Sequence, residues 1–182
     1  MKLILTREEM LARRRLAGGF EPLRTDCTVE ETAGTDINAM LELQLRCRYL
    51  ELLDTADPAL LAPEDVAADT AVTPCADGGS MLTPPAACRR VLAVWLEGWE
   101  REAEVLPAAE LKRAVRLQRN PFTASTAHAP MAVAHPDGQV AAWPASGKCR
   151  RVMAICDAGP DIYKIDERAL GQLCESKYNP IL

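Results

Sequence analysis

The sequence lacks the short motifs that mark familiar catalytic and nucleotide-binding sites. It contains no G-x-G-x-x-G, no P-loop and no G-x-S-x-G pattern. Its two histidines, His128 and His135, have no neighbours at the ligand spacings that a zinc site requires. A cysteine brought beside either histidine by the fold could act as a nucleophile, yet no local signature indicates this chemistry. We therefore expect a protein that is not an enzyme and that uses no cofactor or metal.

Long apolar runs and a disulfide pattern are also missing. No window approaches the roughly 20 apolar residues of a membrane-spanning helix, and the run from Leu3 to Leu5 is too short for a signal peptide. The seven cysteines lie far apart without a C-x-x-C pair, and their odd number argues against a closed disulfide framework. They are Cys27, Cys47, Cys75, Cys88, Cys149, Cys156 and Cys174. We expect reduced cysteines, no membrane contact, and a location in the cytoplasm or in a particle assembled there.

Positive charge is scarce. The 21 Lys and Arg residues face 26 Asp and Glu residues, which gives a net charge of -5. A protein that clamps nucleic acid needs clustered basic side chains, so this balance disfavours tight binding of DNA or RNA. It would suit a surface past which nucleic acid must slide. With 182 residues, 48% of them apolar, the chain can bury one core, or one core and a lobe.

A cluster of basic residues lies near the N-terminus. Thr6 and Glu9 fit a capping box that begins a short helix, which Gly18 and Gly19 end. This helix carries the basic cluster Arg13, Arg14 and Arg15. The pattern fits a solvated terminal arm, and it also fits an arm over residues 1–34 that docks onto an acidic partner. In the second interpretation, removal of residues 1–19 leaves the rest of the chain folded.

The strongest helix signal begins at Thr35 or Asp36 and ends before Asp57-Pro58. It has two apolar stripes, where a surface helix usually has one. The first stripe is Ile37, Leu41, Leu45, Tyr49 and Leu52, and the second is Met40, Leu43, Cys47 and Leu50. The first stripe is expected to meet the chain's own sheet. The second meets either another helix of the same chain or a neighbouring subunit.

A central strand is predicted over residues 88–96, because an apolar run follows the extended entry that Pro84 and Pro85 impose. Gly98 predicts a tight turn directly after it. We expect Trp95 and Trp99 to anchor the core of the sheet, since each side chain can bury on the order of 200 Å². The run C-R-R-V recurs over residues 149–156, which predicts a second, neighbouring strand.

Three further elements complete the expected fold. Residues 131–143 predict a hairpin, because Asp137-Gly138 supplies the positive φ values of a tight turn. The polar segment 118–130 predicts a loop. This loop either protrudes with Phe122 as its docking anchor, or is solvated with Phe122 folded back onto its own domain. Asp166 begins a last helix that runs to residue 176.

These elements predict an α+β fold, in which a helical bundle built on the long N-terminal helix joins a small antiparallel sheet. The expected domain spans residues 35–176. It has a helical part at 35–66, a sheet and loop part at 78–157, and a closing helix at 166–176. Residues 1–34 form the arm, and 177–182 form a C-terminal tail.

The order of four segments carries a family resemblance. They read RCRYLELLDTADP, LTPPAACRRVLAVWLEGW, LQRNPFTASTAHAP and MAVAHPDGQVAAWP. In this order, over about residues 35–156, the chain resembles structural proteins of tailed bacteriophages and prophages of gut Bacteroides-like hosts. More distantly it is similar to the head-to-tail adaptors, or tail tubular A proteins, of short-tailed phages. The N-terminal arm and the last helix depart from that pattern.

The resemblance implies a virion protein at the head-to-tail junction, assembled in the host cytoplasm. Such adaptors form a homo-oligomeric ring beneath the portal, of which twelvefold symmetry is one option, and DNA passes through without specific binding. Portal protein and tail or nozzle proteins would be its partners. The interface candidates are then Arg13, Arg14, Arg15, Met40, Leu43, Cys47, Leu50 and Phe122. Alternatives are another neck or tail-completion protein and, from a different class, a small α+β domain that binds a ligand or protein.

Overall fold

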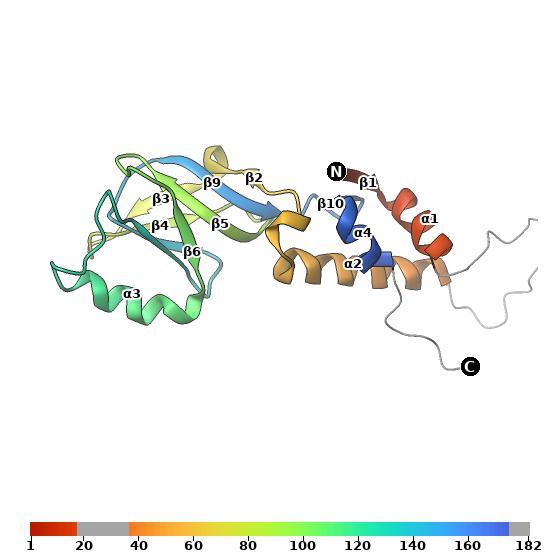
Figure 1. The fold of residues 1–182 in the computed structure, drawn as a ribbon, viewed down its shortest axis with the longest axis horizontal. Coiled ribbons are helices and arrows are strands. Elements are labelled where there is room, and N and C mark those ends of the chain that lie inside the picture. The colour runs from red at the N-terminus through yellow and green to blue at the C-terminus, as the bar shows by residue number, and fades with distance from the viewer. Residues whose placement is uncertain (18–36, 175–182) are drawn as a thin grey trace, which may run out of the picture. The chain divides into compact units, whose positions relative to one another are not determined.

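A computed structural model describes residues 1–17 and 37–174 of the chain (Figure 1). The chain divides into two compact units, one from residues 1–62 and 158–182 and the other from residues 63–157. Within the described residues, an eight-stranded mixed sheet makes up most of the structure, and the four α-helices are short. The predicted bundle built on a long N-terminal helix with a small antiparallel sheet is therefore wrong. Many of the paired strands are far apart in the sequence and become neighbours only when the chain folds.

The first unit places two strands and three α-helices together. Its elements are β1 (Lys2–Thr6), α1 (Arg7–Ala17), α2 (Ile37–Thr55), the 3-10 turn η1 (Pro58–Leu60), β10 (Ile162–Asp166) and α4 (Glu167–Cys174). The strands β1 and β10 pair antiparallel, with Lys2 opposite Asp166. Each strand leads directly into a helix. The Glu9 carboxylate accepts a hydrogen bond from Thr6 N at 2.8 Å, and Asp166 Oδ1 accepts one from Arg168 N at 3.0 Å. The two predicted caps, at Thr6 and at Asp166, are confirmed.

The helix α2 packs through side chains spaced four residues apart. Leu41, Leu45, Tyr49 and Leu53 are all buried, which is the pattern of one face of a helix. Tyr49 also reaches the strand β10, because its hydroxyl accepts a hydrogen bond from Lys164 N at 2.9 Å. Its ring lies 4.8 Å from that of Tyr163, measured between centroids. Three residues of the first predicted stripe, Leu41, Leu45 and Tyr49, therefore face the interior of this unit. Leu52 of that stripe is only half-buried, and Leu53 is the buried residue in its place.

The N-terminal residues are part of this unit, which differs from the arm expected over residues 1–34. Leu5 and Met10 are 6% and 0% exposed, and Arg7 N donates to Asp161 O at 2.9 Å. The first helix thus has partners within its own chain, and its short length is compensated by tertiary packing. Residues 18–34, the proposed helix caps Thr35 and Asp36, and the tail 177–182 lie outside the described residues.

The second unit contains the eight-stranded sheet, in the order β2-β9-β5-β6-β7-β8-β4-β3. Its strands are β2 (Glu64–Asp65), β3 (Ala71–Pro74), β4 (Ser80–Thr83), β5 (Cys88–Leu96), β6 (Ala103–Leu106), β7 (Met131–Ala134), β8 (Val140–Trp143) and β9 (Cys149–Cys156). Its helical elements are η2 (Ala67–Asp69), η3 (Ala108–Glu110) and α3 (Leu111–Gln118). Only the paired strands β6 and β7 run parallel among the described strands, and α3 lies in the connection between them. The sheet curls into a half-barrel (Figure 1).

The two faces of this sheet bury different apolar clusters. Because side chains alternate along a strand, Ala132 points into one cluster and the next residue, Val133, into the other. The inner core consists of Val66, Leu82, Val94, Leu96, Trp99, Ala103, Ala132, Val140, Ala142, Val152, Ala154 and Cys156. The core beneath α3 consists of Ala114, Val133, Ala141 and Trp143. The curl brings both ends of the sheet onto the inner core.

Several local predictions hold in this unit. The strands predicted over residues 88–96 and 149–156 are β5 and β9, and they pair antiparallel as neighbours. The predicted hairpin is β7 and β8, with Gly138 at a φ of 80°. Trp99 is 3% exposed and belongs to the inner core. Trp95, the other expected anchor, is not one of the buried residues of that core. It packs half-buried against them, and its indole Nε1 donates to Trp99 O at 3.0 Å.

Candidate functional site

The most distinctive surface is the outward apolar face of α2. We use this name for the predicted second stripe, Met40, Leu43, Cys47 and Leu50. Met40 is 46% exposed and Leu43 is 65% exposed, while Cys47 is exposed and Leu50 half-buried. Their spacing of three, four and three residues is that of a coiled-coil seam. Large apolar side chains in such a row are typical of a binding surface.

This face lies opposite the buried face of the same helix. Successive residues of an α-helix are rotated by about 100°, so the exposed Leu43 and the buried Leu45 project in nearly opposite directions. The helices α1 and α4 both contact α2. Even so, Met40 and Leu43 keep about half of their surface or more exposed among the residues that the structure describes. No described helix of the chain covers these two side chains.

The three arginines proposed as an interface have different environments. Arg14 is 6% exposed, and its guanidinium donates to Cys174 O at 2.6 Å, at the end of α4. Cations stabilise helix C-termini because the last carbonyls lack intrahelical partners. Arg15 is half-buried and donates to the side chain of Asn38, whereas Arg13 is exposed. Arg14 therefore acts within the fold and is unavailable to a partner.

The loop after α3 presents Phe122, which is 96% exposed. Its base is closed by a two-way hydrogen bond, in which Ser125 N donates to Gln118 Oε1 at 2.9 Å and Gln118 Nε2 donates to Ser125 Oγ at 3.0 Å. Asn120 Oδ1 accepts a further bond from Phe122 N at 3.0 Å. The alternative that this ring folds back onto its own domain is thus excluded. An aromatic ring held in solvent on a hydrogen-bonded loop suits a docking contact.

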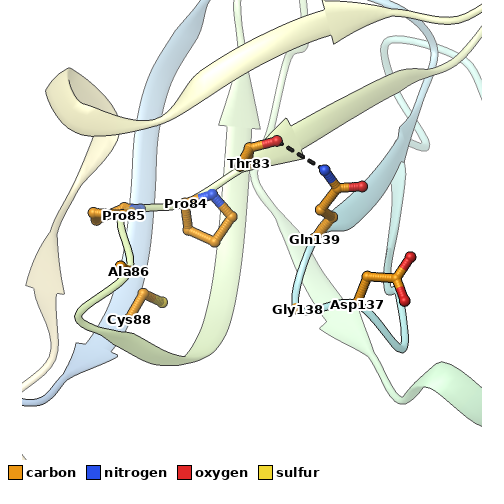
Figure 2. Close-up of a pocket in the computed structure, with 8 residues that line it drawn as sticks. All are labelled: Thr83, Pro84, Pro85, Ala86, Cys88, Asp137, Gly138 and Gln139. Atoms are coloured by element: carbon orange, nitrogen blue, oxygen red, sulfur yellow. Dashed lines mark hydrogen bonds between the residues drawn. The ribbon is translucent and has the colours of Figure 1, made fainter.

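A hollow of about 330 Å³ lies between the turn that joins β4 to β5 and the tip of the β7-β8 hairpin (Figure 2). Its lining is Thr83, Pro84, Pro85, Ala86, Cys88, Asp137, Gly138 and Gln139. Gln139 Nε2 donates to Thr83 Oγ1 at 3.1 Å, which joins the two sides. The sequence did not indicate this hollow, because its two turns are about 50 residues apart and meet only through the pairing of β4 with β8.

Few of the side chains that line the hollow belong to the types that take part in catalysis. The hollow contains one carboxylate, from Asp137, and one thiol, from Cys88. Neither histidine is among its lining residues, and His135 Nδ1 lies 3.2 Å from the Asp137 carboxylate. Across residues 1–17 and 37–174, no group of three or more His, Cys, Asp or Glu side chains could hold a metal ion.

Comparison with protein-family models and with curated protein sequences finds no significant match for this chain. Among the described helices, none combines the length and the apolar character needed to cross a membrane.

Proposed function

We propose that the protein is a structural component of a phage virion, a head-to-tail adaptor that forms a ring beneath the portal. The observation that carries this proposal is the outward apolar face of α2. Leaving Leu43 and Met40 in water is unfavourable by about 25 cal/mol for each Å² of apolar surface. Association with a neighbouring subunit would remove that surface from water.

A ring requires a head-to-tail interface, in which one surface of a subunit meets a different surface of the next. Four side chains cover only part of the roughly 800 Å² that each partner buries in a stable interface. Further surfaces must therefore contribute. The exposed Phe122 is a second apolar anchor, which we assign to contacts with the portal or with tail proteins. The net charge of -5 agrees with a conduit that lets DNA slide past.

A second candidate function is a small α+β domain that binds a ligand or a protein. The hollow beside the β7-β8 hairpin favours it, because its volume of about 330 Å³ lies at the lower end for small-molecule sites. Its lining, however, offers only a few polar groups to orient a ligand. The adaptor proposal explains more of the exposed apolar surface.

Electron microscopy of the purified full chain tests the proposal. We expect closed rings of uniform size, alone or on addition of a cognate portal protein. Particles that remain single subunits with and without portal would contradict the adaptor role. Monomers that bind a small molecule in the hollow would instead support the binding domain.

A further inference from the structure

Two cysteines face each other across the strands β5 and β9. Cys88 is the first residue of β5, Cys156 is the last residue of β9, and the two are direct partners in the antiparallel register. The sequence gives no direct sign of this pairing, because Cys88 and Cys156 are far apart along the chain. It arises because the two similar strands run in opposite directions, so the start of one meets the end of the other.

The backbone hydrogen bonds around this pair define its geometry. Cys88 N donates to Pro85 O at 2.9 Å, and Asp157 N donates to Ala87 O at 2.8 Å. The bond between Asp157 N and Ala87 O therefore joins the strands just beyond the two cysteines, and the register shifts between Cys88 and Arg90 on their other side. This is the pattern of a non-hydrogen-bonded pair, in which opposite Cα atoms lie about 4.5 Å apart and the side chains are closest. A disulfide spans Cα separations of about 4.4 to 6.8 Å.

The two thiols differ in their access to solvent. Cys156 is 8% exposed and belongs to the inner core, whereas Cys88 is half-buried and lines the hollow. Burial raises the pKa of the Cys88 thiol, and hydrogen bonding with Cys156 partly offsets this rise. Burial, together with Cys88 and Glu64, raises the pKa of the Cys156 thiol to about 12. Each thiol thus influences the other, and Cys88 is the one that a small molecule can reach.

From this register and access we infer that Cys88 and Cys156 form a reversible dithiol site, oxidised by low-molecular-weight disulfides such as oxidised glutathione. The Cys88 thiolate attacks one sulfur of the small disulfide, forms a mixed disulfide and releases one thiolate, which takes up a proton. Cys156 then loses its proton to solvent, and its sulfur attacks Cys88 Sγ. A bond forms between the two protein sulfurs, and the second small thiol leaves. The protein loses two electrons and two protons, and one small disulfide becomes two thiols.

The new bond would join the ends of β5 and β9 and close a loop over residues 89–155. That loop contains most of the sheet, including β6, β7 and β8. A long closed loop restricts the unfolded chain strongly, so oxidation stabilises the fold of this unit. The two cysteines are free thiols in reducing surroundings and form a disulfide in oxidising ones. This inference does not depend on the adaptor proposal.

The test uses the reduced full chain, incubated at pH 8 with oxidised glutathione and then mapped by mass spectrometry without reduction. We expect a linked pair of peptides containing Cys88 and Cys156, and a thermal midpoint that rises by several degrees. The variant Cys149→Ser removes another half-buried thiol of β9 and should behave like the parent protein. The variant Cys88→Ser should lose both the linked peptides and the rise.

The inference is overturned if the peptides of Cys88 and Cys156 stay unlinked while any other thiol of the chain is glutathionylated. That result would show that the reagent is active and that the pair does not close. It is equally overturned if the linked peptides form without any rise in the thermal midpoint. Peptide mapping of the parent protein shows whether Cys88 and Cys156 become linked, even if the variant Cys88→Ser fails to fold.

Discussion

At the scale of single residues, the backbone at Gly79 leaves no room for a side chain. A Cβ atom there would lie 2.4 Å from Nε1 of Trp143, a contact that real Cβ atoms do not show. The indole belongs to the core beneath α3 and is 3% exposed, so it cannot swing into solvent without opening that core. Gly79→Ala should therefore lower the free energy of unfolding by about 1 to 3 kcal/mol.

Urea denaturation measures this effect, and Gly147→Ala is the matched control. A Cβ atom added at Gly147 would meet no surrounding atom within 4 Å, and this glycine does not require a positive φ. Its substitution should leave the free energy of unfolding within about 0.5 kcal/mol of the parent value. Equal stability of the two variants would contradict the close packing at Trp143.

Asp166 makes the first unit sensitive to acid. The Arg168 side chain, by hydrogen bonding, holds the pKa of the Asp166 carboxyl at about 2, with further help from Arg168 N. Since the folded-state pKa is depressed, the stabilisation is complete above the ordinary value of 3.8 and is lost as the pH falls toward 2. The thermal midpoint of the parent protein should fall across this window.

The variant Asp166→Asn keeps a good helix cap and removes the charge. We expect it to lose stability at pH 7 and to show a shallower fall of the thermal midpoint between pH 4 and pH 2. Glu8→Gln, which changes an exposed carboxylate of α1 in the same unit, should keep the parent slope. If the thermal midpoints of the parent protein and Asp166→Asn fall equally steeply with pH, protonation of this carboxylate does not destabilise the fold.

At the scale of elements, local signals could be predicted from the sequence and distant pairings could not. Asp137-Gly138 predicted its hairpin, because a tight turn needs few residues to specify it. The run Leu3 to Leu5 did not indicate β1, because its partner β10 lies about 160 residues away. The parallel pair β6 and β7 was also missed. It departs from the antiparallel sheet that the sequence predicted, and α3 forms the crossover that joins the two parallel strands.

The packing of β1 and α1 contradicts the expectation that residues 1–19 can be removed while the rest of the chain stays folded. Burial of Leu5 and Met10 contributes roughly 2 to 5 kcal/mol for each side chain, to judge from substitutions of such residues by alanine. This is a large share of the 5 to 15 kcal/mol that typically stabilises a protein. Deleting residues 1–17 should therefore unfold the first unit. Limited proteolysis and circular dichroism would report the loss of α2 and α4.

The exposed Leu16 provides the control for this deletion, because Leu16→Ser changes the same segment without removing a buried contact. That variant should resist proteolysis like the parent protein. A deletion mutant that keeps its helices and its thermal midpoint would restore the idea of a separable arm.

At the scale of the whole molecule, each compact unit presents an apolar surface to which we assign a partner. The first unit presents the outward apolar face of α2, and the second presents Phe122. Helical periodicity predicted the four residues of that face, because spacing along a helix determines direction. Periodicity alone could not identify the partner of this face, because a face packed against another helix of the same chain has the same pattern. The hollow was unpredictable for a similar reason, because its two turns meet only in the folded sheet.

The mass of the protein in solution, measured by sedimentation velocity at tens of micromolar, tests most directly whether this face joins subunits. We expect the parent chain to sediment as a defined oligomer and Leu43→Glu to sediment as the 19.9 kDa monomer. Leu16→Glu introduces the same change at a leucine of similar exposure on α1 and should remain oligomeric. A monomeric parent chain, or a Leu43→Glu variant with the parent's oligomeric mass, would contradict the assignment of this face as the subunit interface.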